Sequence, residues 1–272
     1  MVNVFSFCLY GPYNVRYYHG MVENVMLVQR HFPDWKVYVY IAPDVEQDMV
    51  NFLRSSSNVV LHETHEIGAK NMIHRFFAID EPEVDIMMVR DADSRIHWKD
   101  RWAIRDFLSH SEFIAHTIRD YEHHTAKLMG GLWGLRKTPE LSIRKLYTSY
   151  VEDTSQGHRL AHDQNFLMDE VYPLVVSRLL IHCSKGPLFQ GEYGVLFPFE
   201  WSSDVFCGKI ETNFIDRLEP TQTRLSFPSV YVRVRDDIQL KQPIIQHPVQ
   251  QIQPTVFIPR PTTKILNFLP KK

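Results

Sequence analysis

The stretch Asp85-Ile86-Met87-Met88-Val89-Arg90-Asp91-Ala92-Asp93-Ser94-Arg95 decides the fold that we expect for this chain. Its apolar part is typical of a buried strand, and two aspartates one residue apart follow directly, between two arginines. In open α/β sheets the ligand crevice lies outside the carboxyl ends of the strands. Two such carboxylates suit Mg²⁺ or Mn²⁺, which bind hard oxygen ligands together with substrate phosphates. The alternative for so short a pattern is a surface turn, in which Asp91 caps a helix and Asp93 is solvated.

Strand and helix patterns alternate around this stretch. The runs that predict strands cover residues 4–10, 37–41, 58–61, 85–89, 113–118, 130–135 and 179–182. The helical spacings cover residues 21–28, 44–53, 69–79, 102–108, 139–151 and a segment that begins at residue 163. This alternation predicts an α/β fold with a mostly parallel sheet, right-handed crossovers and flanking helices.

The composition changes near the C-terminus. Residues 239–261 are rich in glutamine and proline, and proline at this density excludes helices and central strands. We therefore predict one domain over residues 1–227 and an extended C-terminal arm over residues 228–272. The apolar residues of the arm would be exposed unless it packs on the domain or on a partner.

Composition excludes several classes of protein. The chain has 272 residues, is 44% hydrophobic and carries a formal net charge of -2, which argues against binding to nucleic acid. Three cysteines without a CxxC pair indicate a reducing compartment, so we expect a cytoplasmic protein. The N-terminus lacks a signal-peptide pattern, and no apolar run approaches the roughly 20 residues of a membrane span. The dinucleotide, P-loop and nucleophile-elbow motifs are absent, and the oligomeric state is left open.

Three further polar clusters follow predicted strands or open a predicted helix. His182 could complete a metal site and Lys185 could neutralise a diphosphate, although a buried histidine satisfied by a carbonyl group is the commoner case. Asp163 could be a base or an anchor for sugar hydroxyls, or only a helix N-cap. The run 119–124 fits either a substrate rim or a solvated loop.

Some of these segments recur together, in a fixed order, in a known family. They are Phe5-Ser6, Tyr10-Gly11, Gly20 with Asn24, Arg75-Phe76, Val89-Arg90-Asp91-Ala92-Asp93-Ser94-Arg95, Arg119-Asp120, Gly130-Gly131-Leu132-Trp133-Gly134 and Asp163-Gln164-Asn165-Phe166-Leu167. In these residues the chain resembles the DxD glycosyltransferases with a GT-A-like fold that occur in bacteria and in large viruses of chlorella algae. The resemblance covers residues 2–199 and leaves out the arm. The chain departs from it at Cys183, where similar enzymes often have an aspartate after the histidine.

The resemblance implies a metal-dependent glycosyltransferase that holds Mn²⁺ or Mg²⁺ with Asp91, Asp93 and His182. Asp163 would deprotonate the acceptor hydroxyl if configuration inverts, which we prefer, or contact the donor sugar if it is retained. The residues that would bind the nucleotide-sugar donor are Ser6, Leu9, Tyr10, Gly11, Arg75, Arg90, Asp91, Ala92, Asp93, Gly130, Gly131 and Lys185.

By the same resemblance the donor would be UDP-xylose, UDP-glucose, UDP-galactose or UDP-rhamnose. The acceptor would be a glycan or glycoprotein of a viral capsid or cell surface, and a viral enzyme would work in the host cytoplasm. Two other functions remain open. One is a carbohydrate- or nucleotide-binding module on the same fold without turnover. The other is a phosphotransferase with an aspartate nucleophile, although that strand normally comes first in such domains and here it is the fourth.

Overall fold

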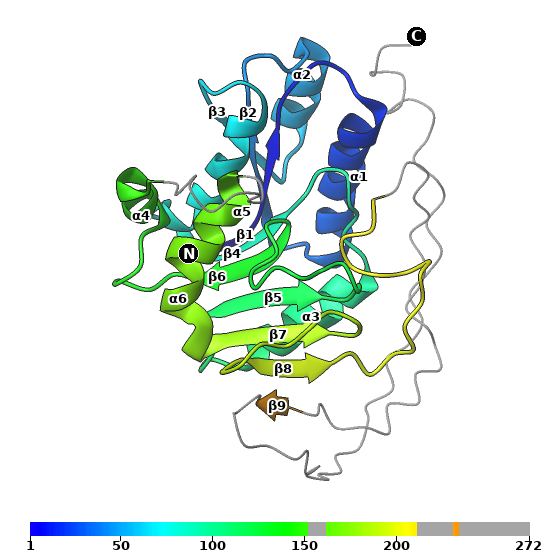
Figure 1. The fold of residues 1–272 in the computed structure, drawn as a ribbon. Helices are drawn as coiled ribbons and strands as arrows, with labels where there is room; N and C mark the ends of the chain where they lie inside the picture. Colours follow the sequence, from blue (N-terminus) through cyan, green and yellow to red (C-terminus); the bar gives the residue numbers. More distant parts are fainter. Residues whose placement is uncertain (152–161, 211–230, 234–272) are drawn as a thin grey trace.

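The computed structural model describes residues 1–151, 162–210 and 231–233. Within these ranges the strands form a single sheet of nine, in the order β3-β2-β1-β4-β6-β5-β7-β8-β9 (Figure 1). The strands are β1 (Val2–Leu9), β2 (Lys36–Ile41), β3 (Val59–Glu63), β4 (Val84–Arg90), β5 (Ala115–Arg119), β6 (Leu132–Arg136), β7 (Leu179–Cys183), β8 (Tyr193–Leu196) and β9 (Tyr231–Arg233). Pairing is parallel except where β6 meets β4 and β5 and where β9 meets β8. The predicted mostly parallel α/β sheet is confirmed.

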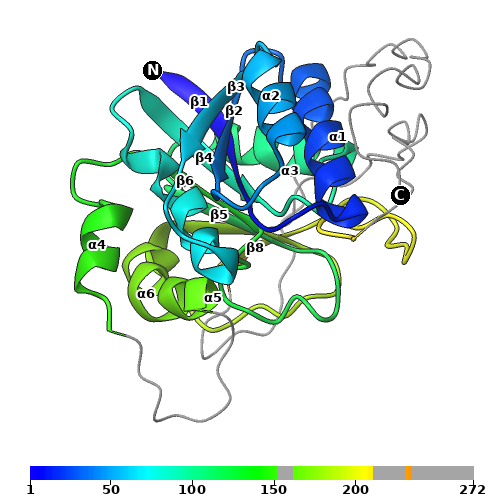
Figure 2. The same cartoon turned by 90° about the horizontal axis from the view of Figure 1, so that it is seen from above.

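Helices cover both faces of the sheet (Figure 2). The helical elements are α1 (Val15–His31), α2 (Gln47–Ser55), η1 (Gly68–Asp80), α3 (Trp98–Ser109), α4 (Ile143–Ser149), α5 (His162–Phe166), η3 (Leu167–Val171), α6 (Tyr172–Val175) and η4 (Val176–Arg178). One core cluster joins the sheet to α1, α2 and α3, and a second joins it to η1, α4, α5 and α6. In the described part of the chain, no helix is long and apolar enough to cross a membrane.

The side chains of β1 alternate between the two core clusters. Phe5 and Phe7 pack in the cluster with α1, whereas Val4 and Cys8 pack in the cluster with η1. Successive side chains of a strand point to opposite faces of the sheet, so a continuous apolar run is needed where both faces are covered. Since β1 and β4 are parallel neighbours, their carboxyl ends meet at the same edge of the sheet. The segments that follow them therefore lie together.

Two features differ from the sequence predictions, and a third prediction lies mostly outside the described residues. The segment expected as an ordinary helix over 69–79 is the 3₁₀ helix η1. The helix expected over 44–53 begins at Gln47, after Glu46 as its N-cap, and Oδ1 of Asp44 accepts a hydrogen bond of 2.9 Å from the backbone N–H of Gly11. Of the predicted C-terminal arm, only 231–233 are described, as the strand β9 that pairs with β8. The rest of the arm lies outside the described residues.

Candidate functional site

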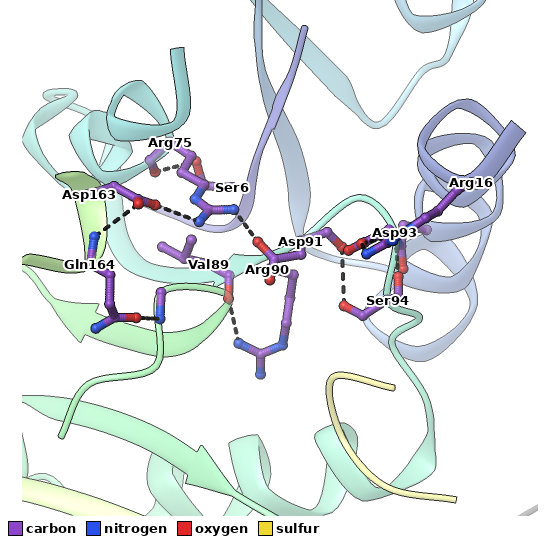
Figure 3. A network of polar contacts seen from close by, with 12 residues as sticks. Ser6, Arg16, Arg75, Val89, Arg90, Asp91, Asp93, Ser94, Asp163 and Gln164 are labelled. Atoms are coloured by element: carbon purple, nitrogen blue, oxygen red, sulfur yellow. Dashed lines mark hydrogen bonds and ion pairs between the residues drawn. The ribbon is translucent and has the colours of Figure 1, made fainter. Parts of the chain in front are cut away.

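A buried arginine joins two carboxylates at the carboxyl edge of the sheet. Nη1 of Arg75 donates to Oδ1 of Asp91, and Nη2 donates to Oδ2 of Asp163 over 2.9 Å (Figure 3). The side chains of Arg75 and Asp163 are each 5% exposed, whereas that of Asp91 is 46% exposed. Burial alone would lower the pKa of Arg75, but the charges of Asp91 and Asp163 raise it, so the guanidinium stays charged. The structure thus brings together three site residues that the sequence predicted separately.

The 3₁₀ helix η1 carries Arg75 into this position. Ser6 of β1 donates from its hydroxyl to the carbonyl oxygen of Arg75 over 2.6 Å. Asn71 donates to the carbonyl oxygens of Leu9 at 3.3 Å and Tyr40 at 3.1 Å. These bonds tie η1 to β1 and β2. Long 3₁₀ runs are uncommon and often mark functional segments.

Asp93 has a different partner, on the other side of the site. Its Oδ2 accepts from Nε of Arg16 over 2.7 Å and from Nη2 of the same guanidinium. Burial, followed by the nearby negative charge of Asp91, raises the pKa of Asp93 although the Arg16 hydrogen bond lowers it. Both carboxylates of the pair are therefore bound to arginines. The alternative of a solvated surface turn does not describe them.

Helix α1 fixes the turn that carries the two aspartates. A Cβ atom at Gly20 would lie 1.9 Å from the carbonyl oxygen of Ala92, so only glycine allows α1 to approach so closely. Asn24 donates to the carbonyl oxygen of Ser94 over 2.7 Å and accepts from the N–H of Ile96 over 3.0 Å. The turn is held by the helix and does not depend on a ligand for its shape.

Two glycines before β6 make room for the polar groups. A Cβ atom at Gly131 would lie 1.9 Å from Oδ2 of Asp91, whereas one at Gly130 would come no closer than 3.3 Å, to Oε1 of Gln164. The N–H of Gly130 donates to that Oε1 over 2.9 Å, and Gln164 donates in turn to the carbonyl oxygen of Leu128 over 2.5 Å. Glycine at 131 therefore lets the carboxylate of Asp91 approach the backbone closely.

His182 does not join this site. It is fully buried, with Nδ1 2.8 Å from Nε2 of His116 and Nε2 2.9 Å from Oδ2 of Asp106. Its strand neighbours Ile181 and Cys183 face the layer of η1 and α4–α6, so alternation turns His182 toward α3. Both ring nitrogens are already engaged there. We leave His182 out of the metal site that the sequence predicted.

The side chain of Arg90 also lies outside the site formed by Asp91, Arg75 and Asp163. Its side chain is 2% exposed, its Nε donates to Oδ1 of Asp100 over 2.9 Å, and its Nη1 donates to the carbonyl oxygen of Val89 over 2.7 Å. Neighbouring residues of a strand face opposite sides, so Arg90 and Asp91 do not share one crevice. The expected donor contact of Arg90 is corrected to a buried ion pair that fixes α3.

The remaining predicted residues are spread around the end of β1 and beyond β7. Ser6, Leu9 and Ala92 are buried, so they support the site from below, whereas Tyr10 and Gly11 are partly exposed. Lys185 is exposed, and its ammonium group lies 5.4 Å from the centre of the Trp201 ring. A set of His97, Asp100 and Cys207 has ligand atoms within 4.8 Å of one another in the described part of the chain. A capping box of α3 and the Arg90 ion pair account for His97 and Asp100 without a metal.

A divalent cation fits the Asp91–Asp93 pair on three grounds. Carboxylate oxygens are the ligands that Mg²⁺ and Mn²⁺ prefer. The raised pKa of Asp93 marks a buried carboxylate that one arginine does not fully compensate. The side chain of Asp91 is 46% exposed, so its carboxylate can reach a cation from its present position.

Arg16 is the residue of this site that the sequence patterns did not single out. It lies in the first turn of α1, where the helix dipole favours acidic side chains, and that turn contains none. A cation at this position, directly after the end of the first strand, needs a carboxylate or an anionic ligand nearby. An arginine at the positive end of a helix was therefore the sequence feature that could have identified Arg16 as a site residue.

Comparisons with known proteins found likeness in fold. No protein-family model matches the chain, and no curated protein matches it. A solved glycosyltransferase involved in glycosylation of the major capsid of PBCV-1 is 13% identical, with a TM-score of 0.45 over 66% of this chain and 81% of that one. A mannosyltransferase from Pyrobaculum calidifontis, in complex with GDP-Man and Mn²⁺, is 14% identical, with a TM-score of 0.43 over 68% of this chain and 55% of that one.

A galactosyltransferase in complex with donor and acceptor sugar analogues is 11% identical, with a TM-score of 0.43 over 66% of this chain and 73% of that one. The mostly parallel sheet with helices on both faces agrees with the α/β fold class expected from the sequence. At these identities the likeness concerns the fold, and the chemistry has to be inferred from the chain's own side chains.

Proposed function

We propose that this chain is a metal-dependent glycosyltransferase that moves a sugar from a nucleotide-sugar donor to an acceptor hydroxyl. The observation that carries the proposal is the pairing of Asp91 and Asp163 with Arg75, beside Gly130-Gly131, at the carboxyl edge of the sheet, with Asp93 on the same turn as Asp91. Ligands of open α/β sheets bind at this edge. Clustered carboxylates with a buried arginine suit a bound cation together with an anionic substrate.

Asp91 and Asp93 would hold Mn²⁺ or Mg²⁺ in this proposal. When bound, the cation supplies Lewis-acid stabilisation for the negative charge that develops on a departing nucleoside diphosphate. The partly exposed carboxylate of Asp91 can reach a ligand from its present position, whereas Asp93 is 9% exposed and has to exchange its Arg16 partner. Lys185, in the loop after β7, remains a candidate for neutralising the diphosphate.

Arg75 and Asp163 have the other two roles in the proposed site, which are to position the carboxylates and to accept from a hydroxyl group. Arg75 holds Asp91 and Asp163 in place, and its positive charge would favour an anionic donor beside them. Asp163 accepts from the N–H of Gln164 on Oδ1 and from Arg75 on Oδ2, and a carboxylate offers about four acceptor positions. It therefore retains capacity to accept a proton from an acceptor hydroxyl if configuration inverts, which we prefer. If configuration is retained, the same capacity would serve a hydroxyl of the donor sugar.

The segment from Leu9 to Gly11 and Ala92 would line the nucleoside side, and Gly130-Gly131 would lie under the donor sugar. We propose a UDP-linked sugar, such as UDP-xylose, UDP-glucose, UDP-galactose or UDP-rhamnose, and a glycan or glycoprotein acceptor. Gly131 lies directly against the carboxylate of Asp91, which would hold the cation, and this closeness is what supports placing the sugar there.

The test is a screen of sugar nucleotides with Mn²⁺, scored by release of nucleoside diphosphate, together with calorimetry of UDP binding. We expect Asp93→Asn to weaken Mn²⁺-dependent UDP binding at least about tenfold, as loss of a charged metal ligand does. Asp48→Asn is the matched control, because Asp48 is exposed on α2. Undiminished binding by a folded Asp93→Asn protein contradicts the proposal. Saturable binding without release of nucleoside diphosphate with any acceptor would instead support the binding module.

A further inference from the structure

Arg16 holds Oδ2 of Asp93 and therefore competes with a bound metal for that carboxylate. We propose that Arg16 exchanges partners, leaving Asp93 for the diphosphate of the donor when the metal–donor complex binds. This inference rests on the proposed function and assigns Arg16 a role in positioning the donor. Figure 3 shows Arg16 and Arg75 on opposite sides of the Asp91–Asp93 turn.

The two arginines differ in their freedom to move. Arg75 is 5% exposed and is held by Asp91 and Asp163 together. Arg16 is 38% exposed, and within the described part of the chain its side-chain hydrogen bonds end on a single oxygen, Oδ2 of Asp93. A half-exposed guanidinium leaves such a contact at small cost, because water replaces the lost hydrogen bonds. Arg16 is therefore the exchangeable partner, and Arg75 is the permanent one.

Without the donor, withdrawal of Arg16 leaves the carboxylates with a net charge that a divalent cation can neutralise. The three carboxylates and two guanidiniums together carry one net negative charge. Without Arg16 they carry two, which a divalent cation neutralises. With Arg16 still on Asp93, the cation would sit beside a second positive charge that is bound to the same carboxylate. Coulomb repulsion between them is strong in a partly buried site.

A diphosphate is the natural second partner for the released guanidinium. Arginine presents a planar fork of donors that binds phosphate oxygens in pairs. Arg16 lies in the first turn of α1, a 17-residue helix, and this turn follows the end of β1 at the edge where the donor would bind. The donor brings the negative charge that Arg16 gives up when it leaves Asp93. Metal and diphosphate would thus each favour the other's binding through Arg16.

The test measures Mn²⁺ alone, and then UDP and GDP with and without Mn²⁺, on the full chain and its variants. We expect Arg16→Ala to bind Mn²⁺ alone about two- to fivefold more tightly, because a competitor for Asp93 is gone. The same variant should bind the Mn²⁺–nucleoside diphosphate complex about tenfold more weakly, because a charge-assisted contact is lost. Mn²⁺ affinity is read by paramagnetic resonance of the free ion, and nucleotide affinity by calorimetry.

Two further variants make the outcome specific. Arg16→Lys keeps the charge and loses the fork, so Mn²⁺ binding should stay near the wild-type value while nucleotide binding falls. Arg54→Ala removes an exposed arginine that pairs with Glu63 outside the site, and both affinities should stay unchanged. Opposite shifts of the two affinities in Arg16→Ala support the exchange.

Shifts in the same direction, or unchanged Mn²⁺ affinity in Arg16→Ala, overturn the exchange and leave the proposed function standing. Failure of the wild-type chain to bind either nucleotide with Mn²⁺ overturns the proposed function, and the exchange with it. Thermal unfolding of each variant shows that the comparison is made between folded proteins.

Discussion

Adding one methyl group at Gly131 should displace Asp91 and leave the fold intact. The new Cβ atom would lie 1.9 Å from Oδ2 of Asp91, and real Cβ atoms essentially never approach closer than 3.0 Å. The difference of 3.0 and 1.9 Å means that the carboxylate has to move by at least about 1 Å. A displacement of this size costs on the order of 100-fold where geometry decides binding or catalysis.

The expected loss is one of binding and catalysis more than of stability. The side chain of Asp91 is 46% exposed, so its contact with Arg75 is screened, and weakening that contact costs less than about 1 kcal/mol. We therefore expect Gly131→Ala to unfold at nearly the wild-type urea concentration. Its affinity for UDP with Mn²⁺, measured by calorimetry, should fall about 10- to 100-fold.

The adjacent glycine supplies the control. A Cβ atom at Gly130 would meet Oε1 of Gln164 at 3.3 Å, which needs a shift of a few tenths of an ångström, and Nη2 of Arg75 at 3.5 Å, which is ordinary van der Waals contact. Gly130→Ala should therefore stay within about threefold of the wild-type affinity, a margin that corresponds to less than 1 kcal/mol. Wild-type affinity in Gly131→Ala, or equal losses in both variants, would refute the placement of Asp91 at the ligand.

Two further predictions concern stability. Arg75→Met should lower the free energy of unfolding by about 3–5 kcal/mol, because it leaves the buried carboxylate of Asp163 unpaired. Urea unfolding should show part of this loss recovered when Asp163→Asn is added, and a loss below about 1 kcal/mol would contradict the buried pair. Burial lowers the pKa of His116 and His182 below 6.5, so the unfolded chain binds more protons and stability falls as the pH drops below 6.5. The slope should reach about 1.4 kcal/mol per pH unit for each histidine and shrink in His116→Gln, and a flat profile between pH 6.5 and 5 would contradict it.

The strand β4, which directly precedes Asp91, could be predicted because a continuous apolar run is typical of a strand that is buried on both faces. The same holds for β1 and β2, where every side chain after the first residues is buried. Gly130-Gly131 and Asp163 were also identified from their place beside predicted strands and helices. These features can be predicted from the local sequence because each residue type favours or disfavours a particular secondary structure in its own segment.

The face to which a polar side chain turns was harder to predict. His182 and Arg90 look like site residues along the chain, yet alternation on β7 and β4 turns both toward α3. Each of them ends on an aspartate of that helix, Asp106 or Asp100. Which face of the sheet receives α3 depends on the packing of distant elements.

The sequence by itself determined an α/β chain whose fourth strand delivers two carboxylates to the binding edge of a sheet. Hydrophobic period, glycine and charge placement encode these features within a few residues of one another. Only the tertiary structure decided the partners: Arg75 between Asp91 and Asp163, and Arg16 on Asp93. These pairs join residues 16 to 88 positions apart in sequence. Ion pairing depends on distance in space and on burial, which the chain acquires only when its helices close over the sheet.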